Sequence, residues 1–94
     1  MSVLFIVERF HDSGTAFAAA ERMAGNGQEV VILFTLEGVE HAVNEGLVGR
    51  LGFAKSINCL ITDGKSEVTP GVNVVDFEGW VRLIEESERI ASWF

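Results

Sequence analysis

One cysteine carries the strongest candidate chemistry in this 94-residue chain. Cys59 is the only thiol, and it lies in the stretch Lys55–Gly64. Ile57, Leu60 and Ile61 predict a short buried strand there. In an open α/β sheet, ligands and reactive groups gather just beyond the carboxyl ends of the strands. The sequence therefore places its one strong nucleophile near the edge where chemistry is expected.

Two interpretations of Cys59 stay open at this point. A reactive cysteine needs thiolate character and solvent access, and nearby Lys55 and Lys65 could supply positive charge. A structural cysteine is a small buried hydrophobe. Ile57, Cys59 and Ile61 alternate, so they share one face of the predicted strand, which favours burial. A single cysteine excludes a dithiol or disulfide within one chain, and it is typical of a reducing, cytoplasmic location.

A second group of polar residues follows the first predicted strand. His11, Asp12 and Ser13 lead into a helix, whose N-terminal backbone N–H groups could bind an anion. They form a candidate anion or partner loop, with helix capping by Asp12 or Ser13 as the other use. His11 and His41 are the only histidines, and they form no ligand-spacing motif, so we expect no metal site. No dinucleotide or P-loop motif is present, so we expect no cofactor.

Apolar strands alternate with amphipathic helices along the chain. Strands are predicted at Val3–Val7, Glu29–Phe34, Ile57–Ile61, Val72–Val75 and Arg89–Phe94. A first helix is predicted after Asp12 or Ser13 through about Ala24. A second is predicted after Gly38, where Val39, Ala42, Val43 and Leu47 recur at helical spacing. A third follows Asp76, with Phe77, Trp80, Val81 and Ile84 as its expected buried face. This order predicts a single domain over residues 1–94, a three-layer α/β/α fold with a five-stranded, mainly parallel sheet.

Composition limits the classes of partner. The formal charge is −7, which argues against direct binding to nucleic acid or to anionic membranes. The first apolar run, Val3–Val7, is too short to cross a membrane or to act as a signal peptide. Hydrophobic residues make up 48% of the chain, a large share for so small a core. We therefore expect a subunit interface, with Trp93 and Phe94 as its candidate residues.

Three stretches of this sequence resemble a known family. They are Val31–Val39, reading VILFTLEGV; Ile57–Leu60, reading INCL; and Val72–Ile84, reading VNVVDFEGWVRLI, followed by the ending Ile90–Trp93. Together they resemble the DsrE/DsrF/DsrH superfamily of small sulfur-relay proteins, and within it the DsrH/TusB branch. The likeness spans nearly the whole chain.

The resemblance implies a cytosolic protein that assembles with like subunits into homo- or hetero-oligomers. Such assemblies pass persulfide sulfur between donor and acceptor proteins, for tRNA thiolation or sulfur metabolism. By this likeness Cys59 is a candidate sulfur carrier and the chain a candidate sulfurtransferase-complex subunit. The alternative is a non-catalytic assembly subunit of the same fold with a buried, inert Cys59, since the DsrH/TusB subunit is often such a partner. A third interpretation is an anion-binding module at the strand ends.

Overall fold

The computed structural model describes residues 2–8, 14–35, 45–60 and 69–93, with backbone alone for residues 92 and 93. Its elements are β1 (Ser2–Val7), α1 (Gly14–Gly25), β2 (Glu29–Phe34), α2 (Glu45–Arg50), β3 (Ser56–Leu60), β4 (Val72–Val75), α3 (Phe77–Glu86) and β5 (Arg89–Trp93). Among these residues, no helix is long and apolar enough to cross a membrane.

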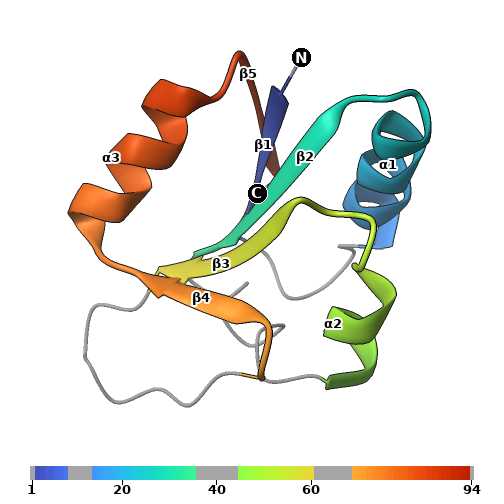
Figure 1. Ribbon diagram of the computed structural model, residues 1–94, viewed down its shortest axis with the longest axis horizontal. Helices are drawn as coiled ribbons and strands as arrows, with labels where there is room; N and C mark the ends of the chain where they lie inside the picture. Colours follow the sequence, from blue (N-terminus) through green and yellow to red (C-terminus); the bar gives the residue numbers. More distant parts are fainter. Residues whose placement is uncertain (1, 9–13, 36–44, 61–68, 94) are drawn as a thin grey trace.

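The strands form one five-stranded sheet in the order β4-β3-β2-β1-β5, and every neighbouring pair is parallel. The helices α1 and α2 lie on one face and α3 on the other (Figure 1). The predicted α/β fold with a five-stranded parallel sheet is confirmed. Because β1 and β2 are central, both of their faces are buried, which explains their continuous apolar runs.

Two apolar cores lie on opposite faces of this sheet. The larger core packs β1, β2 and β3 against α1 and α2. Its helix contacts include the edge-to-face pair of Phe17 on α1 and Phe34 on β2, with ring centroids 6.2 Å apart. The smaller core joins Leu4, Ile6 and Leu33 to residues of α3. Alternate residues of each central strand therefore serve different cores.

The start of α3 is fixed by a side-chain cap. The Asp76 carboxylate accepts a hydrogen bond of 2.8 Å from the backbone N–H of Gly79. This confirms the predicted cap and satisfies one of the free donors of the first turn. A Cβ at Gly79 would stand 3.0 Å from the Cβ of Val75, so glycine lets the helix start close to the end of β4.

The predicted buried face of α3 is partly wrong. Trp80 and Ile84 do contact the smaller core, but the third contact is Leu83. Phe77 and Val81 are 59% and 50% exposed. Five apolar residues in a ten-residue helix cover a wider arc than one sheet contact needs, and the sheet selects the arc around residues 80, 83 and 84.

The middle helix, α2, runs from Glu45 to Arg50 and includes Leu47, the last residue of the predicted helical spacing. Its predicted start at Val39 lies outside the described residues. Gly49 lies inside α2, and nothing approaches its missing Cβ within 4 Å, so close packing does not require glycine at this position.

Candidate functional site

The carboxyl ends of the five parallel strands share one edge of the sheet, the expected place for a site. The connections after β1, β2 and β3 begin there. His11, Asp12 and Ser13, the candidate anion or partner loop, lie outside the described residues, as do His41 and Lys65. The described part of this edge includes the strand ends and the start of α3.

Cys59 lies next to the end of β3, but its side chain is completely buried. It stands between Phe34 of β2 and Val74 of β4 in the register of the sheet. Its side chain belongs to the larger core, on the same face as Ile57, which confirms that these two residues share a buried face. Burial raises the pKa of the Cys59 thiol, because a thiolate would lose its hydration there. At neutral pH the thiol is protonated and shielded from solvent.

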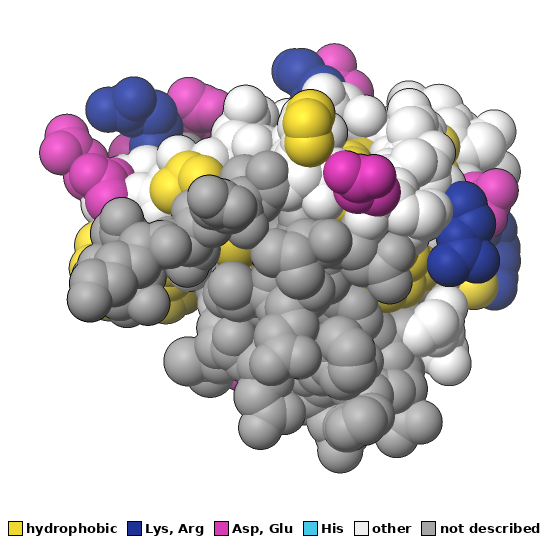
Figure 2. Space-filling view, turned by 90° about the horizontal axis from the view of Figure 1, so that it is seen from below, with side chains coloured by type: hydrophobic (Ala, Val, Ile, Leu, Met, Phe, Trp, Pro, Cys, Tyr) yellow, Lys and Arg dark blue, Asp and Glu magenta, His cyan; other side chains and the backbone are white. Residues whose placement is uncertain are grey.

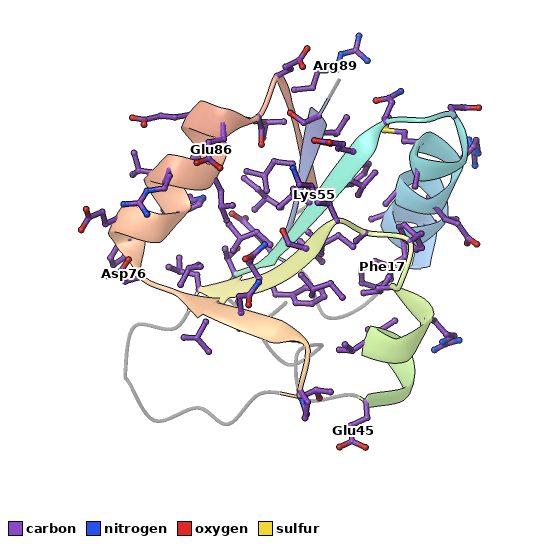
Figure 3. The ribbon with its side chains drawn as sticks, in the orientation of Figure 1. Phe17, Glu45, Lys55, Asp76, Glu86 and Arg89 are labelled. Carbon is purple, nitrogen blue, oxygen red and sulfur yellow. The ribbon has the colours of Figure 1, made fainter. Side chains whose placement is uncertain are left out.

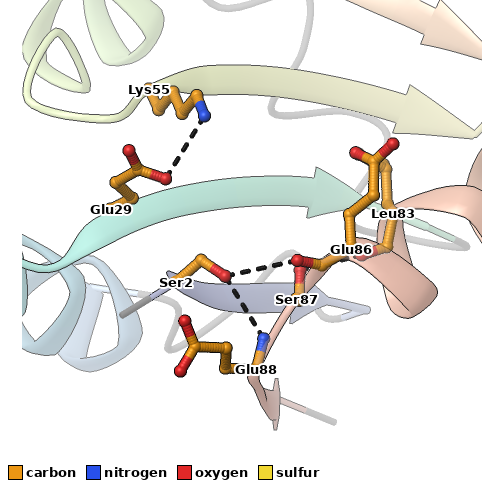
Figure 4. A network of polar contacts seen from close by, with 7 residues as sticks. All are labelled: Ser2, Glu29, Lys55, Leu83, Glu86, Ser87 and Glu88. Atoms are coloured by element: carbon orange, nitrogen blue, oxygen red, sulfur yellow. Dashed lines mark hydrogen bonds and ion pairs between the residues drawn. The ribbon is translucent and has the colours of Figure 1, made fainter.

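Lys55 does not activate this cysteine. It precedes β3 and lies four positions before Cys59 in the chain, a distance of about 13 Å along an extended strand. The Lys55 ammonium instead pairs with the Glu29 carboxylate at 3.2 Å (Figure 4). Figure 3 shows Lys55 at the start of β3 and Asp76 beyond the opposite end of the sheet. The cationic group that the sequence placed closest to Cys59 therefore lies at the amino edge.

Near this edge of the sheet, two buried polar atoms of the described residues have no hydrogen-bond partner. Thr35 follows β2 and is 3% exposed; its N–H donates to the carbonyl of Val7 at 3.0 Å, but its hydroxyl oxygen is unpaired. The indole N–H of Trp80 is also buried and unpaired. A shallow cavity of about 360 Å³ is lined by Val74, Val75, Asp76 and Gly79. Because the Asp76 carboxylate already occupies the α3 N-terminus, this cavity is unsuited to an anion.

The amino edge of the sheet holds a polar network with a structural role (Figure 4). The Ser2 hydroxyl donates to the carbonyl of Glu86 at 3.4 Å and accepts from the N–H of Glu88 at 3.2 Å. The Ser87 hydroxyl donates to the carbonyl of Leu83 at 2.8 Å. The two bonds of Ser2 hold the turn between α3 and β5 against the start of β1, and the bond of Ser87 closes the last turn of α3. A small cavity of about 200 Å³ lies beside them.

No cluster of three or more His, Cys, Asp or Glu side chains within the described ranges could hold a metal ion. Trp93 ends β5 opposite Val7 of β1, while its side chain and all of Phe94 lie outside the described residues. The candidate interface at the C-terminus therefore stays a prediction.

Sequence reasoning missed a different apolar surface. Among the described residues, the large hydrophobic side chains that the structure leaves exposed are Val74, Phe77, Val81 and Ile90. Phe77 and Val81 lie one turn apart on α3. The sequence did contain a feature that indicates this exposure. The apolar residues of α3 span too wide an arc for all of them to be buried in one stripe.

Comparisons with known proteins bear on the fold. No protein-family model matches this chain, and no curated protein matches it. Among solved structures, the ychN protein from E. coli superposes with a TM-score of 0.67 at 10% sequence identity, over 99% of this chain and 100% of that chain. At this identity the likeness shows a shared fold.

Proposed function

We propose that this protein is a non-catalytic assembly subunit of a sulfur-relay complex in the cytoplasm, and that Cys59 serves its core rather than carrying sulfur. The observation that carries the proposal is the burial of Cys59, which is 0% exposed and belongs to the larger core. Of the two interpretations of Cys59 that the sequence leaves open, this geometry favours the structural one.

Persulfide transfer makes specific demands on a cysteine. A thiolate must attack the outer sulfur of the donor persulfide, and a partner thiol must later reach the sulfur that was accepted. Both steps need an open approach to Sγ and a low thiol pKa. Cys59 has neither, since its side chain is covered and burial raises its thiol pKa.

Three observations support an assembly role. The fold agrees with the sequence resemblance to the DsrE/DsrF/DsrH superfamily. By that resemblance, the DsrH/TusB subunit is often a partner without a comparable catalytic role. Exposed Phe77 and Val81 provide apolar surface for contact with protein. The charge of −7 disfavours nucleic acid as a direct partner, so we expect like subunits and sulfur donor or acceptor proteins instead.

The second candidate function is sulfur carriage by Cys59 itself. One observation favours it: Cys59 is the penultimate residue of β3, so a small opening at the carboxyl edge would bring it near solvent. In that case the folded protein would exchange between a closed state with a protonated thiol and an open, reactive state.

Intact-protein mass spectrometry separates the two functions. The folded protein and its Cys59→Ser variant are incubated with a small persulfide donor, and both are also treated after denaturation. We expect no sulfur gain on folded wild type and a gain of one sulfur on denatured wild type alone. Rapid loading of folded wild type, absent from Cys59→Ser, would instead establish the carrier function.

A further inference from the structure

A cavity of about 280 Å³ lies between α1 and α2. One face of each helix and the turn after α2 line it, through Phe17 and Glu21 of α1, Leu47 and Arg50 of α2, and Phe53. On the right of Figure 2, where α1 and α2 lie, hydrophobic surface is exposed next to basic and acidic side chains. The two helices therefore enclose a space whose walls are partly apolar and partly charged.

The apolar wall of this cavity is held in place by the larger core. Phe17 packs edge-to-face on buried Phe34 of β2, with ring centroids 6.2 Å apart, and Figure 3 shows it on the side of α1 nearest α2. Leu47 and Phe53 are partly buried and also pack against this core. Because these side chains are already ordered, a ligand that contacts them loses little affinity to the entropy of ordering them.

Two opposite charges line the same cavity. Glu21 and Arg50 have only apolar residues or glycine at the positions three and four away in the sequence, so neither can form an ion pair along its own helix. Across the residues that the structure describes, neither forms an ion pair with another side chain. A cavity of this volume is about 8 Å across, so one small molecule can contact both charged groups.

We propose that this cavity binds a free α-amino acid with an apolar side chain. The carboxylate of the ligand pairs with Arg50, whose planar guanidinium can donate two parallel hydrogen bonds to it. The ammonium of the ligand pairs with Glu21, and its side chain lies on the apolar wall. Cys59 is not among the residues that line the cavity, so this site goes beyond the proposed assembly role and does not depend on it.

Charge and size select this class of ligand. The protein carries a formal charge of −7, which repels a simple carboxylic acid but not a zwitterion without net charge. A simple amine would pair with Glu21 and leave Arg50 without a partner. The volume of the cavity lies near the lower end of the range for ligand sites, about 300 Å³, so the ligand is small.

Titration of the isotope-labelled protein with L-leucine, followed by the NMR shifts of its backbone amides, tests the site. We expect saturable shifts centred on α1 and α2, with a Kd of about 1 mM or lower. Glu21→Gln and Arg50→Gln should each weaken binding at least about tenfold. The matched controls Glu45→Gln and Arg22→Gln make the same changes of charge on the same two helices, outside the cavity lining, and should bind like wild type.

Two analogues of leucine test which charge of the ligand meets which residue. 4-Methylpentanoate lacks only the amino group, and 3-methylbutylamine lacks only the carboxylate. Wild type should bind each at least about tenfold more weakly than leucine. Arg50→Gln should bind the amine no more weakly than wild type does, and Glu21→Gln should bind the acid no more weakly than wild type does. The opposite pattern would overturn the assigned pairing.

Other outcomes overturn the proposal as a whole. Absence of saturable shifts up to about 10 mM leucine would exclude the site, and so would binding of glycine as tight as that of leucine, since glycine cannot use the apolar wall. Ala18 is exposed and also lines the cavity, so Ala18→Leu should fill it and abolish binding in a protein that circular dichroism shows to be folded. Unchanged leucine binding by Ala18→Leu would place the ligand elsewhere. The persulfide experiment on Cys59 tests the proposed function independently of all these results.

Discussion

Replacing the buried thiol by a hydroxyl should destabilise this protein strongly. The Cys59 side chain is fully buried in the larger core, whose described members are apolar. Serine nearly preserves the volume of cysteine but buries a polar group, at a cost of about 1–3 kcal/mol. We therefore expect Cys59→Ser to lower the free energy of unfolding by about 2 kcal/mol.

Alanine at the same position separates polarity from volume. Cys59→Ala removes one heavy atom and leaves a small void, for which about 1 kcal/mol is the usual cost of a comparable truncation. The expected order of stability is wild type, then Cys59→Ala, then Cys59→Ser. For a domain of this size, each kcal/mol corresponds to a change of about 4–8 °C in Tm.

The raised thiol pKa adds a dependence on pH. Above about pH 8.5 the unfolded chain releases the thiol proton, while the folded chain keeps it because burial raises the pKa of Cys59. The folded state then binds more protons than the unfolded state, so stability falls as pH rises. The contribution of the protonated Cys59 thiol to stability is fully present at neutral pH, and it is lost as the pH rises toward the pKa of the thiol in the folded protein. The stability advantage of wild type over Cys59→Ala should therefore shrink in alkaline buffer.

Urea unfolding of the three proteins at neutral and alkaline pH measures these stabilities. The alkylation rate of native wild type measures the solvent access of the Cys59 thiol. Slow alkylation before unfolding and fast alkylation after it are expected. The reasoning is refuted if both variants unfold within about 0.5 kcal/mol of wild type, the usual range for exposed positions, or if folded wild type is alkylated as fast as unfolded protein.

Further substitutions test the local structure. Asp76→Ala removes the carboxylate that caps the Gly79 N–H at 2.8 Å and should cost about 1 kcal/mol of unfolding free energy in urea titration, whereas no change would mean that the cap is not formed in solution. Gly71 has a φ of +99°, so Gly71→Ala should destabilise by about 1 kcal/mol or more in the same assay. Gly49→Ala is its matched opposite and should stabilise α2 by up to about 1 kcal/mol, since open space surrounds the new methyl group.

Much of the fold was predictable because its strands are unusually apolar. Val3–Val7 and Glu29–Phe34 were expected as buried strands from their continuous hydrophobic runs, and both lie at the centre of the sheet. Asp76 was recognised as a cap by its residue type and by the amphipathic segment after it. These features depend on neighbours in sequence, which a single chain displays directly.

The sequence by itself determined the strands, the parallel α/β architecture and the presence of one thiol near the end of β3. It left the state of Cys59 open, because alternation places a side chain on a face without showing what covers that face. Only the tertiary structure decided that the core packed against α1 and α2 encloses Cys59 and raises its thiol pKa. It also decided which arc of α3 meets the sheet and so left Phe77 and Val81 exposed, since burial depends on contacts between elements far apart in sequence.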